Sequence, residues 1–201
     1  MKLTREFYER NTLLVARDIL GKYLVHKSSE GKTIGKIVEV EAYIGPNDEA
    51  SHAYKGLRTK RNEIQYGRGG YAYIYQIYGI YFCFNIVTEK IAKPEVVLIR
   101  ALEPLEGNEI MAERRKINNL CLKDRRRLAN GPGKLCIAMG INKNLYGEDL
   151  CGDLLYIIND EKIISQKNII STTRINIDYA GKSSNLPWRF LIANNKYVSI
   201  Q

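Results

Sequence analysis

The sequence has few of the residues that build metal sites and covalent-catalysis sites. Among its 201 residues it contains only 2 histidines and 4 cysteines. The cysteines form no C-x-x-C pair, and too few histidines lie near them to complete a zinc site. We therefore expect reduced thiols and no metal or other cofactor; these cysteines are Cys83, Cys121, Cys136 and Cys151.

Long apolar runs are also missing. No run approaches the roughly 18 apolar residues of a membrane span, and the first six residues lack the apolar core of a signal peptide. No Pro/Gly/Ser-rich linker and no internal repeat divides the chain. We expect a single domain over residues 1–201 that stays in the cytoplasm, associated with the nucleoid in a bacterium.

Basic residues are in excess. Lys and Arg number 31 against 22 Asp and Glu, so the formal net charge is +9. Such a charge indicates which partners the protein binds rather than how it folds. Polyanions are the first candidates and an anionic membrane is the second. Cations gather in residues 55–61, 114–116 and 123–127. Runs of this kind usually coat a solvated face, but with this net charge they favour phosphate contact.

Periodicity and turn residues predict the regular elements. A helix over residues 13–20 is expected after the cap Asn11 and before Gly21. Further helices are expected at 109–116 and 123–129, and residues 161–173 are expected to be a polar surface loop. His26, beside a lysine, is expected at the surface. The expected strands are 23–26, 32–43, 94–102, 174–179 and 187–191.

The stretch from residue 38 to residue 52 concentrates acids. Apolar side chains alternate with Glu39, Glu41 and Tyr43, a turn follows at 45–48, and His52 lies beyond it. This strand therefore delivers two carboxylates and a tyrosine to its end. A half-exposed strand with solvated glutamates is the alternative, and periodicity alone favours it because surface acids far outnumber catalytic ones. Strict alternation points both glutamates the same way, so either can reach a site.

Residues 71–86 are rich in tyrosine. Two aromatic strands flank Tyr78 and Gly79, which predicts a tight β-hairpin, with Gly79 supplying the positive φ that such turns require. Tyr78 then stands at the tip, where an aromatic side chain can wedge into a nucleic-acid base stack. The alternative is that these aromatics simply favour strands and fill a core.

Two further features point to anionic partners. Arg100 interrupts the apolar strand 94–102, and a buried arginine needs an acid in the core or a site reached through the sheet. The turn at 130–134, Asn-Gly-Pro-Gly-Lys, opens a helix whose free N–H groups suit a phosphate. Its spacing is not that of a P-loop, so nucleotide hydrolysis does not follow.

Taken together and in order, these motifs resemble the alkyladenine (3-methyladenine, methylpurine) DNA glycosylases nearly end to end. The resemblance implies an α+β fold, that is, one mixed α/β domain with a curved antiparallel sheet, surrounding helices and a protruding β-hairpin. The motifs that carry it are residues 16–21, 38–52, 73–85, 98–104, 130–136 and 187–190.

The resemblance also implies roles for particular residues. Glu41, rather than Glu39, is the general base that activates water, Arg100 holds the water and the nearby phosphate, and the backbone carbonyl of Ile175 completes the hydrogen bonds of the water. Tyr78 is the intercalating residue. Asn85 rejects the 2-amino group of normal guanine and, with four others, forms the base pocket: Tyr43, Ala50, His52 and Tyr75.

The implied activity is that of a monomeric, monofunctional DNA N-glycosylase for base-excision repair. Its partner is double-stranded DNA that carries damaged purines, namely alkylated adenine or guanine, hypoxanthine and ethenoadenine. No lysine stands at a matching catalytic position, so water is the expected nucleophile and an abasic site the product. The chain departs from the family pattern at several positions: Asn176 replaces a glycine, Gln65 and Arg68 replace the commoner methionine and proline, and residues 182–184 lack a tryptophan.

Two other functions fit parts of the sequence. A non-catalytic nucleic-acid-binding protein can use the same basic surface and hairpin, and it predicts salt-sensitive binding without base release. Hydrolysis of free nucleosides is a weaker alternative, because it needs neither the wedge nor the positive charge.

Overall fold

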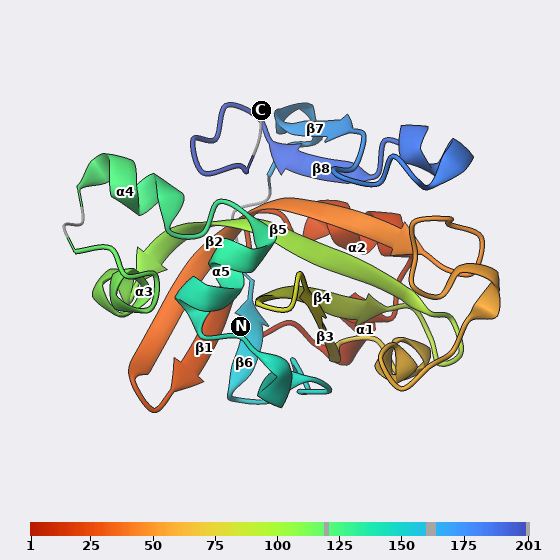
Figure 1. The fold of residues 1–201 in the computed structure, drawn as a ribbon, viewed down its shortest axis with the longest axis horizontal. Coiled ribbons are helices and arrows are strands. Elements are labelled where there is room, and N and C mark those ends of the chain that lie inside the picture. The colour runs from red at the N-terminus through yellow and green to blue at the C-terminus, as the bar shows by residue number, and fades with distance from the viewer. Residues whose placement is uncertain (119–120, 160–163, 200–201) are drawn as a thin grey trace.

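The computed structural model describes residues 1–118, 121–159 and 164–199, and within them the chain forms one α+β domain (Figure 1). The strands of the open antiparallel sheet are β1 (Tyr23–Ser28), β2 (Gly31–Ile44), β3 (Ala72–Ile77), β4 (Tyr81–Thr88), β5 (Glu95–Glu106), β6 (Leu155–Ile158), β7 (Ile169–Thr172) and β8 (Arg189–Ile192). The α-helices are α1 (Arg5–Tyr8), α2 (Thr12–Asp18), α3 (Asn108–Arg114), α4 (Leu122–Arg127) and α5 (Pro132–Met139).

The two longest strands, β2 and β5, form the centre of the sheet and cross the middle of the molecule (Figure 1). The strand order is β3-β4-β5-β2-β1-β6, and β8 pairs with β2 beyond the point where β1 ends, with β7 on its other side. Strand β2 therefore contacts three partners, which is why its acidic end is buried rather than solvated.

The two faces of the sheet have different side chains. Val40, Ala42, Val97 and Ile99 are fully buried on one face, in the main core, which also contains buried residues of α2 and α5. The residues between them in sequence project to the opposite face, because successive side chains of a strand alternate. This opposite face carries the glutamates of β2 and Arg100.

Local signals set the helix boundaries. The side chain of Asn11 accepts hydrogen bonds from the backbone N–H groups of Leu13 and Leu14, so it caps α2 as predicted. Gly21, at φ 84°, lies just after this helix. The glycine-rich turn leads into α5, with Pro132 at its first position, where the missing N–H group costs nothing.

Three predictions about elements are wrong. Residues 174–179 form no strand; Asn176, at φ 58°, turns the chain there. Residues 161–173 contain β7, although 161–163 lie outside the described residues. His26 is 5% exposed rather than at the surface, because β2 and β6 flank β1 on both sides. Its Nδ1 donates a hydrogen bond to the Met139 carbonyl, 2.6 Å away.

Across the described segments, no helix is long and apolar enough to cross a membrane.

Candidate active site

Four neighbouring strands bring one row of side chains into register. Tyr73 of β3 pairs with Asn85 of β4, Asn85 with Leu98 of β5, and Leu98 with Glu41 of β2. These residues lie on the face opposite the main core. The row explains how side chains from positions 41 to 98 converge, because antiparallel pairing puts directly opposed residues on the same face.

A cavity of ≈ 630 Å³ lies over this row. On the far side the cavity is lined by residues 130–134, the glycine-rich turn before α5, and by Arg115. Eight of the nine residues predicted for the site line it: Tyr43, Ala50, His52, Tyr75, Tyr78, Asn85, Arg100 and Ile175.

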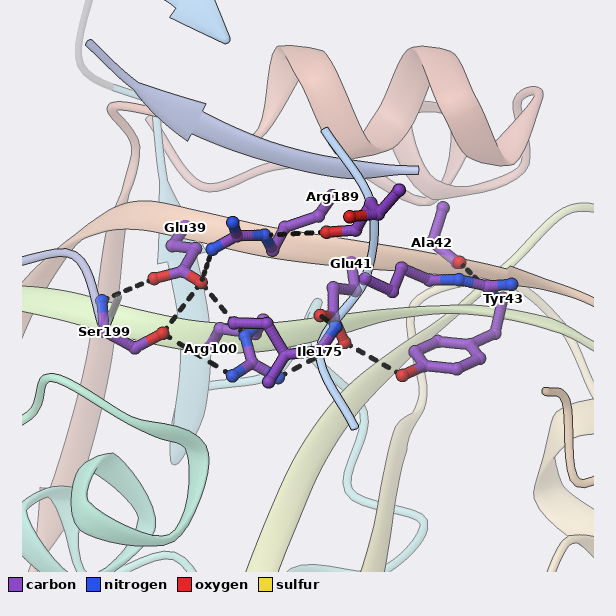
Figure 2. A network of polar contacts seen from close by, with 10 residues as sticks. Glu39, Glu41, Ala42, Tyr43, Arg100, Ile175, Arg189 and Ser199 are labelled. Atoms are coloured by element: carbon purple, nitrogen blue, oxygen red, sulfur yellow. Dashed lines mark hydrogen bonds and ion pairs between the residues drawn. The ribbon is translucent and has the colours of Figure 1, made fainter. Parts of the chain in front are cut away.

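The ninth, Glu41, lies directly behind the wall and is fully buried. One carboxylate oxygen accepts a hydrogen bond from the backbone N–H of Ile175 at 2.8 Å (Figure 2). The other accepts one from the Tyr43 hydroxyl at 2.8 Å and lies 3.3 Å from Nη1 of Arg100. All three donors belong to residues that line the cavity. Glu41 is therefore oriented from three sides, next to the space where a ligand fits.

Glu39 occupies a different position, although it too contacts Arg100. Its carboxylate accepts hydrogen bonds from Arg100 Nε at 3.0 Å, from Arg189 at 3.1 Å, and from the backbone N–H and hydroxyl of Ser199 at 2.6 and 2.8 Å (Figure 2). Four donors surround this carboxylate, so its hydrogen-bonding capacity is taken up by the protein itself.

Arg100 has the acidic partners that a buried arginine needs. Its side chain is 8% exposed and bridges the two glutamates. Burial opposes its charge, but the carboxylates of Glu41 and Glu39 outweigh that effect and raise the pKa of Arg100. Both roles expected for Arg100 are therefore present: it pairs with acids in the core, and it lines the cavity.

His52 is held as a neutral ring. Burial, with a smaller effect from the cation Arg61, lowers its pKa to about 4. Its Nδ1 shares a hydrogen bond of 2.7 Å with the Tyr73 hydroxyl, and its ring meets that of Tyr75 at 4.6 Å and 78°. An uncharged, edge-packed imidazole offers a flat face to the cavity without repelling a cation.

The phenols around the cavity stay protonated. Burial, reinforced by the neighbouring carboxylate of Glu41, raises the pKa of Tyr43 well above its ordinary value, and burial likewise raises that of Tyr75. Tyr43 therefore remains a hydrogen-bond donor to Glu41 across the physiological pH range.

Asn85 is 1% exposed and lines the cavity. Its side-chain nitrogen donates to the carbonyl of Tyr73 at 3.1 Å, which fixes the orientation of the amide. The neighbouring Gln65, one of the departures from the family pattern, is also 1% exposed and lines the cavity, and its Oε1 has no hydrogen-bond partner.

The hairpin of β3 and β4 is present as predicted, and Tyr78 is at its tip with 82% exposure. Both Tyr78 and Gly79 have positive φ, 51° and 70°. Because Tyr78 also lines the cavity, an exposed aromatic ring stands at the mouth of an aromatic pocket.

Among the arginines in and near residues 55–61, some pair with surface acids and one lines the cavity. Arg58 pairs with Glu63, and Arg68, further on, pairs with Glu9. Arg61 instead lines the cavity, with its guanidinium 5.2 Å from the centre of the Tyr75 ring.

No group of His, Cys, Asp or Glu in the ranges that the structure describes is arranged to hold a metal ion. The four cysteines are free thiols, and burial raises the pKa of Cys83, which lines the cavity, to about 11.

Sequence reasoning missed four residues that contact the site. Tyr73 and Tyr75 are two positions apart on β3 and therefore share one face of the strand, so strand periodicity pointed to Tyr73. Arg174 lies over the Tyr43 ring and pairs with Asp48. Asp48 belongs to the acid-rich stretch 38–52, but no local signal pairs it with Arg174, because the two come from segments far apart in the chain. Ser199, whose backbone N–H donates a hydrogen bond to Glu39, likewise has no local sequence signal.

Fold and site together define a single-domain α+β protein with an aromatic pocket over a buried carboxylate. The family model described as "Methylpurine-DNA glycosylase (MPG)" matches residues 6–196. The chain therefore belongs to the methylpurine-DNA glycosylase family.

Similar proteins extend over the whole chain. A protein from Clostridium acetobutylicum is 50% identical over 203 residues, covering 100% of this chain and 98% of its own. One from Methanocella arvoryzae is 48% identical (98% and 95% covered), and one from Desulfitobacterium hafniense is 45% identical (100% and 99% covered). Each is named "Putative 3-methyladenine DNA glycosylase".

Proposed function

We propose that this protein excises damaged purines from duplex DNA. In this reaction the damaged nucleotide is flipped into the cavity, and water activated by Glu41 hydrolyses its N-glycosidic bond, leaving an abasic site. One observation carries the proposal: the buried Glu41 carboxylate contacts the wall of an aromatic cavity large enough to admit a purine base, and the exposed Tyr78 lines the same cavity. The name of the similar proteins agrees with it.

The chemistry needs an anion close to the sugar. Breaking the bond between base and deoxyribose develops oxocarbenium character, so a fixed carboxylate both stabilises that charge and activates the attacking water. Glu41 is oriented for this by Ile175 and Tyr43, while Arg100 supplies a fixed positive charge for the water and a phosphate. An alkylated purine is already cationic and departs readily.

The pocket suits a flat and even a charged base. Tyr43 and His52 are proposed to stack on its two faces, with Tyr75 closing one side. Because the lowered pKa of His52 leaves the imidazole neutral, His52 itself adds no positive charge against a cationic alkylated purine. The buried amide of Asn85 is proposed to exclude the 2-amino group of normal guanine.

A duplex hides the glycosidic bond, so the base has to be extruded, and lesions that pair badly cost less to flip. Tyr78 is proposed to fill the gap that the flipped base leaves, as apolar wedges do in other DNA-binding proteins. The net charge of +9 supplies attraction to the phosphates. The proposed lesions are 3-methyladenine, 7-methylguanine, hypoxanthine and ethenoadenine.

The test replaces Glu41 with glutamine, which keeps the shape and removes the charge. We expect Glu41→Gln to lower the single-turnover release of hypoxanthine and ethenoadenine from a duplex oligonucleotide by about 10²–10⁴-fold, the usual contribution of a general base. Free base is measured by chromatography. Glu63→Gln, at an exposed acid paired with Arg58, is the matched control and retains wild-type release. Near-wild-type activity of Glu41→Gln refutes the assignment.

The product identifies the nucleophile and separates the alternatives. With water as nucleophile the abasic strand stays uncut, and borohydride traps no protein–DNA adduct. A trapped adduct instead indicates Lys134, the lysine that lines the cavity. Salt-sensitive DNA binding without release of any lesion base indicates the non-catalytic binding protein.

A further inference from the structure

We propose that the buried ion pair between Arg174 and Asp48 is the positioning device of the site: it fixes the ring of Tyr43, the carboxylate of Glu41 and the loop that carries Ala50 relative to one another. This inference rests on the proposed function, in which Tyr43 contacts the base and Glu41 the water. Neither Arg174 nor Asp48 lines the cavity, so both act through other residues.

The pair is fully enclosed. Both side chains are 0% exposed, and the guanidinium meets both carboxylate oxygens, at 2.5 and 2.8 Å. The same two nitrogens donate to the carbonyls of Ala42 at 2.9 Å and Ser183 at 3.1 Å. A buried two-point pair with further backbone partners has one geometry, because any rotation leaves a charge or a donor unsatisfied.

The guanidinium also lies over two aromatic rings. Its central carbon lies 4.7 Å from the centre of the Tyr43 ring and 5.2 Å from that of Trp188, the only tryptophan of the chain. Arginine stacks well on aromatic faces because its charged group is planar and weakly hydrated. The guanidinium of Arg174 thus contacts the ring of Tyr43, and the Tyr43 hydroxyl donates to Glu41.

The residue after Arg174 acts on the same carboxylate. The backbone N–H of Ile175 donates to Glu41 at 2.8 Å, so fixing Arg174 also fixes this donor (Figure 2). The chain then turns at Asn176, whose φ is 58°. Glu41 is therefore held by two donors, Tyr43 and Ile175, that both depend on one guanidinium.

Asp48 connects the ion pair to the loop that carries Ala50. Its carboxylate accepts hydrogen bonds from the backbone N–H groups of Ile44 and Ala50, both at 3.1 Å, and so shapes the loop that leads to His52. The two residues proposed to stack on the nucleobase, Tyr43 and His52, and the proposed general base Glu41 thus depend on the same ion pair. A reaction that requires near-attack geometry is sensitive to such a support, since a misplacement of about 1 Å can cost about 10²-fold in rate.

The variant Arg174→Lys tests the inference, because lysine keeps the charge but loses the planar stack and the second contact to Asp48. We expect the single-turnover excision rate to fall by about 10²-fold, while the affinity for a duplex with an abasic-site analogue changes less than about 3-fold. Emission of Trp188 shifts, because its stacked cation is removed. Arg5→Lys is the matched control: Arg5 is 15% exposed, pairs with Asp149 and lies over the ring of Tyr71, but it does not line the cavity, and this variant keeps wild-type rate and emission.

Asp48→Asn is the second variant. It removes the charge beside Arg174 and keeps an oxygen for only one of the two backbone donors, because Ile44 and Ala50 donate to different carboxylate oxygens. It should show the same split between rate and affinity. Circular dichroism confirms that each variant is folded. Wild-type excision rates in either folded variant overturn the inference and leave the proposed function intact. A wild-type protein that releases no base overturns the proposed function itself.

Discussion

Arg100 joins two buried carboxylates that stand two positions apart on β2 and have different surroundings. Glu39 accepts four hydrogen bonds from the protein, whereas Glu41 accepts two, from Tyr43 and the backbone of Ile175, and forms an ion pair with Arg100. Arg100 and Arg189 together balance the two negative charges, so this buried cluster is neutral. At this scale the contacts distinguish a carboxylate whose four acceptor positions are filled by the protein from one that keeps acceptor capacity for water.

The variant Glu39→Gln should therefore act on stability. Removing its charge leaves Arg100 and Arg189 with a single buried acid, and breaking a buried pair costs about 3–5 kcal/mol. We expect the free energy of unfolding in urea to fall by this amount. Glu106→Gln, at the half-exposed pair with Lys32, should cost about 1 kcal/mol or less. A Glu39→Gln protein as stable as the wild type would show that the two arginines do not depend on this carboxylate.

At the scale of elements, the β3–β4 hairpin and the acidic end of β2 meet at the cavity from different parts of the chain. Register across β3, β4, β5 and β2 aligns them, and the turn at Tyr78 and Gly79 sets the direction of the tip. Two successive residues of positive φ match the twist of the strands that they connect. The element thus presents an aromatic ring to solvent without cost to the core.

Tyr78→Ala tests the hairpin. Because the ring is 82% exposed, we expect unchanged unfolding in urea. Binding to a lesion duplex should weaken by about 1–3 kcal/mol, the usual contribution of stacking between a base and an aromatic side chain. Flipping is followed by the fluorescence of ethenoadenine in the duplex. Leu122→Ala, at a residue of α4 that is 77% exposed, is the control. Equal affinity and equal flipping in Tyr78→Ala would remove the wedge from the mechanism.

For the whole molecule, both histidines couple stability to pH. Burial lowers the pKa of His52 from 6.5 to about 4 and lowers that of His26 as well. The unfolded chain restores the ordinary values, so it binds more protons than the folded protein below pH 6.5. The stability from these groups is therefore complete above that pH and is lost as the pH falls toward 4.

We expect the free energy of unfolding to decline across this window, by up to about 1.4 kcal/mol per pH unit for each histidine. Urea titrations at successive pH values measure it. His26→Asn keeps a donor near the Met139 carbonyl but does not titrate, so its slope should be shallower than that of the wild type. Identical slopes would show that His26 is not a source of the pH dependence.

Much of the architecture was predictable because it depends on local pattern. The cap at Asn11, the hairpin around Gly79 and the strands that became β1, β2, β5 and β8 follow from turn residues and alternation. β7 was not predictable, since its residues are partly exposed or exposed and it forms a strand only by pairing with β8. His26 was misjudged because its burial depends on β6, which lies more than a hundred residues away.

Local pattern alone predicts the tip position of Tyr78, from its turn residues, and the common face of Glu39, Glu41 and Tyr43, because a period of two residues is a property of the strand. The α+β class was implied by the family resemblance of the motifs. Only the folded molecule shows how the two glutamates differ in their hydrogen-bond donors. The Ile175 donor to Glu41 is 134 positions away, and Arg174 is 126 positions from Asp48. Contacts at such separations have no local sequence pattern, since they form only when the sheet brings distant segments together.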